Sequence, residues 1–385
     1  MTLLDAPPAP QAELTGGGLQ LTWNGHDTEL HPLWLRDRST EHGQVDPTNR
    51  QRLFTPFDVP CDLVVVDAEI CDDLVVVRFS DGHVARLDLV TILRDLRWID
   101  DQEAPPPPEP WTAPLATPPH VDWASIGWCD SEADPHAVLR FLDAFYRHGY
   151  VVVRNTPAEE GTVERVANRL GYISGQNFGW TFDVRVEPRA TDLAYTSVEL
   201  LAHTDQPYRI DPPGIQLLHC IVNDAQGGDS TIVDGLAAAR AVRKERPSWF
   251  RALVEVEVGF RYDRGDDTAF NSGHVFEFDR HGRFRGIRLS SRLDTPLPRP
   301  GDDLDAWYRG RRWLTEWLND PAHQATFRLE PGDVMFMDNH RALHGRTAFD
   351  AASGARHLQG CYIEHDGPDT MYRLTLRRLR GTLSG

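Results

Sequence analysis

The sequence predicts a mainly β protein with covering helices, composed of a small N-terminal β-rich domain and a larger jelly-roll, a cupin-like double-stranded β-helix. Three observations predict this class. Short apolar runs bounded by turn residues recur along the chain, as in proteins built from many short strands. A proline-rich stretch separates the apolar runs of the first hundred or so residues from those that follow. The sequence shows neither a regular alternation of strands and helices nor a G-x-G-x-x-G motif, so a dinucleotide-binding fold is not expected.

The N-terminal domain is expected over residues 1–103. Its apolar segments are LQLTW (19–23), DLVVVDAEI (62–70) and LVVVRFSDGHVARLDL (74–89). Asp81 and Gly82 give the last segment a two-residue turn signal, so it is expected to fold as a hairpin. Residues 104–120 are expected to form a linker, because their many prolines supply no backbone donors to a helix or sheet.

The second domain is expected over residues 121–385 and begins with a helix signal. In DPHAVLRFLDAFYRHG, Asp134 is the expected N-cap and Gly149 the stop, and YVVVRN follows as a strand. Two more helices are expected over 162–170 and 304–318, the second with its apolar residues on one face. The remaining strands are expected over residues 215–222, 228–233, 254–261, 274–278, 284–289, 327–337 and 356–364.

Composition restricts the partners and the location. A net charge of −18 argues against binding to nucleic acid or an anionic lipid surface. The chain contains no apolar run long enough to span a membrane and does not begin with a basic, apolar leader, so a cytoplasmic location is expected. Five irregularly spaced cysteines without a C-x-x-C pair indicate reduced thiols.

Two short segments indicate a metal site. In LLAHTDQPYR, His203 and Asp205 follow an apolar strand, and residues two apart in a strand face the same side. In PGDVMFMDNHRALHGR, a strand leads to His344, with His340 as a competing candidate. Two imidazoles and one carboxylate form the facial triad of non-haem Fe(II) oxygenases, which leaves coordination positions open. Taken alone, His-x-Asp also fits a structural hydrogen bond.

A third segment indicates a carboxylate site. Arg356 lies twelve residues after His344, and its guanidinium can bind the far carboxylate of a 2-oxo acid through two hydrogen bonds. A hydroxyl at Ser230 or Thr231, in GGDSTIVDG, would add another hydrogen bond to that carboxylate. An ordinary surface salt bridge is the alternative interpretation of Arg356.

Many segments appear in an order typical of one family: LHPLWLRDR (30–38), DGH (81–83), DLAYTS, HTDQPY, PPGIQLLHCI, GGDSTIVDG, PGDVMFMDN, LHGR and RHLQGCY. The chain resembles the γ-butyrobetaine dioxygenase and trimethyllysine dioxygenase branch of the taurine dioxygenase (TauD) superfamily. The resemblance implies an enzyme that uses Fe(II), 2-oxoglutarate and O2, and that forms a homodimer. It implies that His203, Asp205 and His344 bind iron, that Arg356 anchors 2-oxoglutarate, and that Leu218 contacts this cosubstrate.

The N-terminal domain departs from the family pattern. The relatives bind a structural zinc ion there through three cysteines and the histidine of DGH. This chain keeps His83 but lacks the cysteines, and offers only Ser39, His42 and Asp46 in that stretch. Structural zinc sites favour thiolate and imidazole ligands, so zinc is not expected.

The substrate positions also depart from the family pattern. The aromatic cage that the family builds around a trimethylammonium group matches Phe178, Phe182, Tyr195 and Gln206, so three of four positions keep a ring. The positions that bind the substrate carboxylate in the relatives match Asp192 and Ser290 or Ser291. An anionic Asp192 would repel a carboxylate and favour an amine, a guanidine or a hydroxyl, and the neighbouring Arg292 would either neutralise Asp192 or bind an anion such as a phosphonate.

These residues predict hydroxylation of an unactivated C–H bond in a small cationic or zwitterionic metabolite, such as a betaine, an amino acid or an aminophosphonate. One alternative keeps the iron chemistry but gives desaturation, cyclisation or C–N cleavage, because substrate position decides the outcome. The other alternative is a cupin-type binding protein that holds a metal without catalysis.

Overall fold

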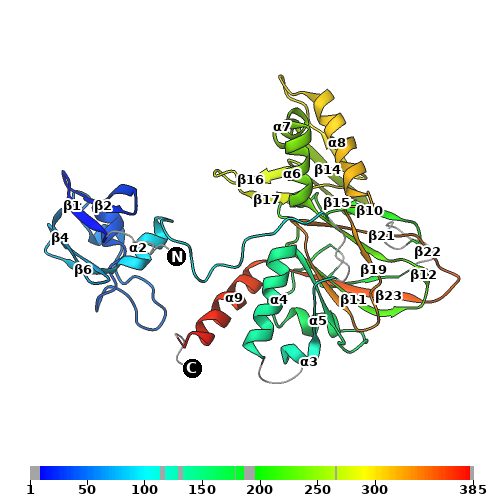
Figure 1. Ribbon diagram of the computed structural model, residues 1–385, viewed down its shortest axis with the longest axis horizontal. Helices are drawn as coiled ribbons and strands as arrows, with labels where there is room; N and C mark the ends of the chain where they lie inside the picture. Colours follow the sequence, from blue (N-terminus) through cyan, green and yellow to red (C-terminus); the bar gives the residue numbers. More distant parts are fainter. Residues whose placement is uncertain are drawn as a thin grey trace, which may run out of the picture. The chain divides into compact units, whose positions relative to one another are not determined.

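The computed structural model describes residues 9–112, 118–128, 133–177, 179–185, 196–264 and 267–381. The chain divides into two compact units, Met1–Gln102 and Glu103–Gly385, and each is described by itself. Both are built mainly of short β-strands with several helices (Figure 1).

The N-terminal unit contains two three-stranded antiparallel sheets. Its elements are β1 (Gln11–Leu14), β2 (Leu19–Trp23), β3 (His26–Leu30), α1 (Pro32–Arg36), η1 (Pro56–Asp58), β4 (Val65–Cys71), β5 (Leu74–Phe79), β6 (Val84–Asp88) and α2 (Leu89–Asp95). Alternate residues of β5, namely Val75, Val77 and Phe79, are buried in a core of this unit. The expected hairpin is present, and Gly82 adopts a φ of 87° in its turn.

The larger unit contains a six-stranded sheet in the order β7–β8–β20–β11–β23–β9. Its strands are β7 (His120–Asp122), β8 (Tyr150–Arg154), β20 (Val334–Asp338), β11 (Ile215–Asn223), β23 (Arg356–Ile363) and β9 (Thr181–Val184). All neighbours are antiparallel except β7 and β8. In β11, Ile215 and Leu217 belong to an apolar core, whereas Gln216 and Leu218 line a cavity.

Helices cover the apolar face of this sheet. They are α3 (Trp123–Ile126), α4 (Pro135–His148), α5 (Thr162–Ala167) and α9 (Asp366–Leu379), and α4 and α9 lie side by side (Figure 1). Helix α4 has the ends that its sequence predicts. The Asp134 carboxylate accepts a hydrogen bond from the His136 backbone N–H, and Gly149 ends the helix with a φ of 77°.

A four-stranded antiparallel sheet lies on the other side of the cavity, in the order β10–β21–β13–β19. Its strands are β10 (Leu200–His203), β21 (Ala342–Arg346), β13 (Ser230–Asp234) and β19 (Ala325–Phe327). A second core, which includes fully buried Trp307, joins this sheet to further helices and small sheets. These are α6 (Gly235–Glu245), α7 (Pro247–Glu255), α8 (Leu304–Leu318), β14 (Val258–Arg264), β15 (Asp267–Gly273), β16 (Phe276–Phe278), β17 (Phe284–Ile287) and β18 (Asp294–Pro296). The strands β12 (Gln226–Gly227) and β22 (Phe349–Asp350) pair separately.

Several elements differ from the expectation. Residues 235–255 form α6 and α7, so the strand predicted over 254–261 begins only at Val258. The strand predicted over 327–337 is divided into β19 and β20 by a turn in which Gly332 adopts a φ of 90°. The helix predicted over 162–170 ends at Ala167, and α9 was not predicted. Helix 304–318 has the predicted bounds.

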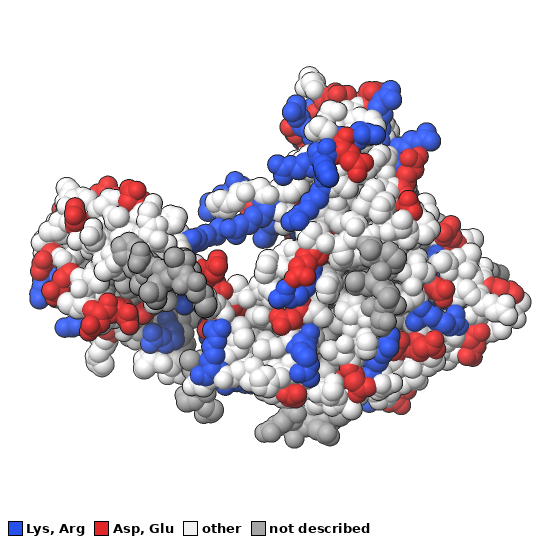
Figure 2. All heavy atoms as spheres, in the orientation of Figure 1, with Lys and Arg blue, Asp and Glu red and all other residues white. Residues whose placement is uncertain are grey.

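The surface mixes acidic and basic side chains on the face shown in Figure 2, with basic residues gathered near the β16–β17 hairpin. That hairpin carries exposed Arg280, Arg283 and Arg285. No helix within the described residues is both long enough and apolar enough to cross a membrane.

Candidate active site

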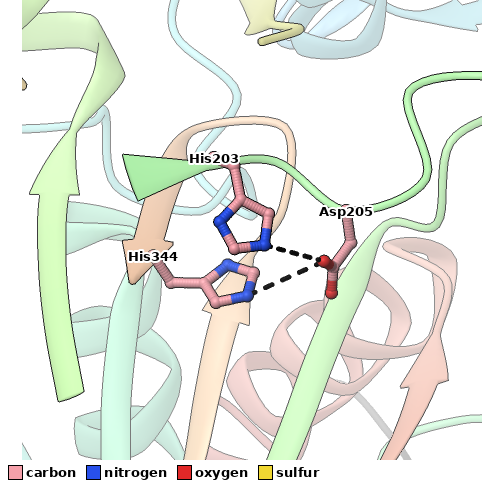
Figure 3. A group of neighbouring side chains, drawn as sticks. All are labelled: His203, Asp205 and His344. Atoms are coloured by element: carbon pink, nitrogen blue, oxygen red, sulfur yellow. Dashed lines mark ion pairs between the residues drawn. The ribbon is translucent and has the colours of Figure 1, made fainter. Parts of the chain in front are cut away.

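His203, Asp205 and His344 meet in the larger unit (Figure 3). His203 ends β10 and is the direct cross-strand partner of His344 in β21, which places the imidazole rings 4.5 Å apart. Asp205 follows β10 by two residues, and its Oδ1 lies 3.5 Å from His203 Nε2 and 3.7 Å from His344 Nε2. All three ligand atoms lie within 4.8 Å of one another, as a shared metal ion requires. His340 lies apart from them, with Nε2 3.0 Å from the Pro212 carbonyl.

The tautomer of His203 suits a metal ligand. Its Nδ1 lies 2.8 Å from the Leu201 carbonyl oxygen, which can only accept a hydrogen bond. The proton therefore belongs on Nδ1, and the lone pair of Nε2 points toward Asp205 and His344.

Hydrogen bonds to Oδ2 fix the orientation of the Asp205 carboxylate. Its Oδ2 accepts hydrogen bonds from the Tyr362 hydroxyl, at 2.7 Å, and from the Gln216 side-chain amide. Its backbone N–H donates to the Asn339 side chain at 2.7 Å. Oδ1 is therefore the oxygen that faces both imidazoles.

Electrostatics keep the triad in its metal-binding form. Burial lowers the pKa of His344 to about 4, against the opposing effect of Asp205 and with the help of His203, so the ring is neutral near pH 7. Burial alone would raise the pKa of Asp205, but His344, His203 and the Tyr362 hydroxyl together hold that pKa well below its usual range.

A cavity of about 400 Å³ adjoins the triad, and Arg356 lies in its wall. The Arg356 side chain comes from β23, in the six-stranded sheet, and the residue is only 9% exposed. Within the described chain it forms no ion pair: Nη2 makes a long 3.4 Å contact with the Gly228 carbonyl, and Nε has no hydrogen-bond partner. Burial and the nearby Arg346 guanidinium lower the pKa of Arg356 to about 10. A buried cation in this state fits the carboxylate of a bound acid, and the surface salt bridge considered from the sequence is wrong.

Of the other residues predicted to contact the cosubstrate, the structure places two in the cavity wall and one outside it. Ser230 and Leu218 line the cavity with Arg356. Thr231 is buried but does not line it, because neighbouring residues of β13 face opposite sides.

Four of the predicted substrate residues line the cavity: Phe182, Gln206, Ser290 and Arg292. Phe182 stacks on Tyr362 with ring centroids 5.4 Å apart. Ser291 is exposed and does not line the cavity. The predicted positions Phe178, Asp192 and Tyr195 lie outside the described residues.

Sequence reasoning missed several residues of the site. Gln216 and Tyr362 fix Asp205, and Tyr208 and Tyr262 line the cavity as a stacked pair 4.7 Å apart. A signal existed for Gln216, since it precedes Leu218 by two residues in one strand and shares its face.

The stretch of the N-terminal unit in which the sequence predicts no zinc site holds a hydrogen-bonded cluster. Ser39 Oγ lies 3.0 Å from His83 Nε2, and Glu41 Oε2 lies 3.7 Å from the same nitrogen. Asp46 accepts hydrogen bonds from the backbone of the following turn. Among the described residues, the one group of three or more His, Cys, Asp or Glu side chains placed to share a metal is His203, Asp205 and His344.

Comparison with known proteins identifies the family. The family described as Taurine catabolism dioxygenase TauD, TfdA family matches residues 118–362, which is more than half of the chain. The chain belongs to this family. Gamma-butyrobetaine dioxygenase from Pseudomonas sp. (strain AK-1) is 36% identical to this TauD-family enzyme, over 93% of this chain and 94% of the relative. Human mitochondrial trimethyllysine dioxygenase is 30% identical over 87% of this chain and 80% of the relative.

A solved structure supports the fold. The crystal structure of AAD-2 in complex with Mn(II) and N-oxalylglycine matches with a TM-score of 0.50 and 16% identity, over 66% of this chain and 97% of that chain. The family membership and the triad confirm the expected class, an Fe(II)- and 2-oxoglutarate-dependent dioxygenase. The reading as a non-catalytic cupin-type protein is therefore set aside.

Proposed function

We propose that this TauD-family dioxygenase hydroxylates an unactivated C–H bond of a small cationic or zwitterionic metabolite, while 2-oxoglutarate is converted to succinate and CO2. The names of the relatives support this substrate class, since γ-butyrobetaine and trimethyllysine both carry a cationic nitrogen. A betaine, an amino acid and an aminophosphonate all fall within the class.

One observation carries the proposal: the triad and a buried Arg356 that forms no ion pair with any described residue line the same cavity. His203, Asp205 and His344 would hold iron, and Arg356 would bind the far carboxylate of 2-oxoglutarate. Ser230 would add a hydrogen bond to that carboxylate, and Leu218 would form an apolar wall. Bound iron would activate O2, the oxidant for both substrates, so that one oxygen atom would enter succinate as 2-oxoglutarate loses CO2 and the other would enter the C–H bond.

The residues around the triad position its metal ligands and shield the site from water. Tyr362 and Gln216 keep one oxygen of Asp205 turned toward the imidazoles, so the ligand set is formed before a metal arrives. Phe182, packed on the Tyr362 ring, restricts water beside the triad. Gln206, Ser290 and Arg292 would contact the substrate, and Phe178, Asp192 and Tyr195 remain proposed contacts by the family pattern alone.

The organisation of the chain forms part of the proposal. Residues 121–385 would be the catalytic double-stranded β-helix, supported by six- and four-stranded sheets that both contribute to the cavity wall. Residues 1–103 would be a β-rich domain without chemistry of its own, joined through 104–120. The active form would be a homodimer, as the family resemblance implies, and its location would be cytoplasmic, as expected from the sequence.

Anaerobic reconstitution tests the proposal. Fe(II) and 2-oxoglutarate should together produce a weak visible charge-transfer band, which should be absent in His203→Ala. After oxygen is admitted, succinate should form, and a betaine, amino acid or aminophosphonate from a panel should gain one oxygen atom. Failure of the wild type to convert 2-oxoglutarate with every panel member would refute the proposal.

A further inference from the structure

Gln206 is a buried side-chain amide whose carbonyl oxygen has no hydrogen-bond partner among the described residues. The residue is 6% exposed and lines the cavity directly after the metal-binding Asp205. Buried side-chain amides are nearly always hydrogen-bonded, because a lost partner costs free energy. An amide in this state fits a ligand that supplies the missing partner.

The backbone holds Gln206 in an uncommon conformation. Its φ is 49°, in the left-handed region that residues other than glycine, asparagine and aspartate rarely adopt. Local strain of this kind persists where the surrounding structure imposes it, and it is concentrated at binding sites. The neighbouring Thr204 supplies that support, since its N–H donates to the Leu289 carbonyl at 2.9 Å.

The surroundings of Gln206 do not satisfy its amide. It lies near the Tyr362 hydroxyl, which donates its one proton to Asp205 at 2.7 Å and can therefore only accept from the Gln206 amide N–H, so Oε1 is left without a donor. The cavity that Gln206 lines is also lined by the stacked rings of Tyr208 and Tyr262 and by Asp263. Ring faces and a carboxylate favour a cation, and the amide carbonyl can accept a hydrogen bond from it.

We infer that Gln206 accepts a hydrogen bond from an N–H group on the cationic nitrogen of the substrate. The inference rests on the proposed function and specifies its substrate class: an ammonium or guanidinium that keeps at least one proton. A fully methylated ammonium offers no donor, so it would leave the Gln206 Oε1 unsatisfied. Sites built around a hydrogen bond discriminate strongly against an analogue that lacks it.

Matched pairs of ligands test this inference. In 4-(dimethylamino)butanoate one N–H replaces one N-methyl group of γ-butyrobetaine, while charge and chain length stay the same. Nε,Nε-dimethyllysine and Nε-trimethyllysine form a second pair. The wild type should favour the N–H member of at least one pair by about tenfold or more, both in kcat/KM and in equilibrium binding to the enzyme with Mn(II) and 2-oxoglutarate.

Variants tie the preference to the amide. Gln206→Met removes the hydrogen bond at similar size and should bring the ratio within each pair to about one or below. Gln206→Glu keeps an acceptor and should retain the preference. Gln11→Met, at an exposed position of β1, is the matched control and should leave the ratio unchanged. Binding of Mn(II) and 2-oxoglutarate to each variant checks that the metal site is intact.

A wild type that does not favour the N–H member of either pair overturns the inference, and so does an unchanged ratio in Gln206→Met. Absence of binding by all four ligands also overturns it. The proposed function is judged separately, because it fails only if the wild type does not convert 2-oxoglutarate to succinate with any ligand of the panel.

Discussion

Tyr362 links two strands of the site through one hydroxyl. It donates to Asp205 Oδ2 at 2.7 Å and accepts a hydrogen bond from Gln216 Nε2 at 3.2 Å. Burial and the adjacent Asp205 raise the pKa of Tyr362 well above its usual value, so the proton stays on the phenol. The carboxylate thus has a fixed donor behind it at all ordinary pH values.

Tyr362→Phe should therefore weaken metal binding without unfolding the protein. Loss of a hydrogen bond behind a ligand typically lowers metal affinity or activity by about 10- to 100-fold. The Kd for Mn(II) or Fe(II), measured by competition with a chelator, checks the effect. Tyr308→Phe, at a half-exposed position on α8, is the matched control. An unchanged Kd in Tyr362→Phe would show that Gln216 alone orients Asp205.

The Arg356→Met substitution should weaken the binding of 2-oxoglutarate but stabilise the folded protein. Removing a buried cation that binds a carboxylate should raise the KM for 2-oxoglutarate by about 30-fold or more, equivalent to ~2 kcal/mol. The same change should raise the free energy of unfolding without ligand by roughly 1–3 kcal/mol, since the unpaired guanidinium is desolvated in the folded state. Kinetics and denaturant unfolding measure the two effects. Arg312→Met, on the exposed face of α8, should change neither. A less stable Arg356→Met protein would assign the arginine a structural role.

At the scale of the residue, local sequence patterns predict the metal ligands but not the residues that hydrogen-bond to them. His203 and Asp205 are separated by one residue, but β10 ends at His203, so the predicted strand geometry brings out the pair without by itself fixing the direction of Asp205. Tyr362 reaches Asp205 across 157 residues of sequence. That contact depends on the register between β11 and β23, which pairs Gln216 with Tyr362 and cannot be read from either segment alone.

At the scale of the element, the two faces of β11 lie in different environments. Gln216 and Leu218 face the cavity, while Leu217 and His219 point to the side covered by helices. His219 is 0% exposed, and the Pro157 carbonyl near its ring opposes the effect of burial on its pKa without cancelling it. Burial lowers its pKa to about 4 from 6.5, and the positive charge of nearby Arg165 acts in the same direction.

His219, in this strand, should make the free energy of unfolding depend on pH. Because the folded-state pKa of His219 is depressed, the unfolded chain binds the proton first as the pH falls. The stabilising effect is complete above about pH 6.5 and is lost progressively toward about pH 4, with a total of roughly 3 kcal/mol. His219→Leu should reduce the loss of unfolding free energy between about pH 7 and pH 4 by up to this amount. Urea unfolding at several pH values measures it. Parallel pH profiles for wild type and variant would contradict the assignment.

Helix and strand predictions succeeded where caps and periodicity agree. Asp134 and Gly149 bound α4 as expected, because a side-chain cap and a left-handed glycine act locally. The pair α6–α7 was missed although Asp234 caps α6 and Pro247 begins α7. The β-branched residues near Val254 and Val256 favoured a strand, and packing in the second core decided for the helix.

At the scale of the whole molecule, each unit buries its own core. One cluster of buried apolar residues lies wholly within Met1–Gln102, and the other three lie within Glu103–Gly385. The linker expected over 104–120 is not a free spacer throughout. Trp111 is buried in the larger unit, and its indole N–H donates to the His148 carbonyl at 2.9 Å. Composition identified the prolines but not this anchor, because its partner lies 37 residues away.

Separate cores should give separate unfolding transitions. Ligands stabilise only the part of a protein that binds them, by about 2.7 kcal/mol when the ligand concentration is 100 times Kd. The metal site and cavity belong entirely to Glu103–Gly385. Calorimetry of the full chain should therefore show two transitions, of which Mn(II) and 2-oxoglutarate raise only one. In His203→Ala this shift should disappear while the other transition keeps its temperature. A single transition that moves as a whole would mean that the N-terminal unit unfolds cooperatively with the larger unit, and that the binding energy of the site stabilises both.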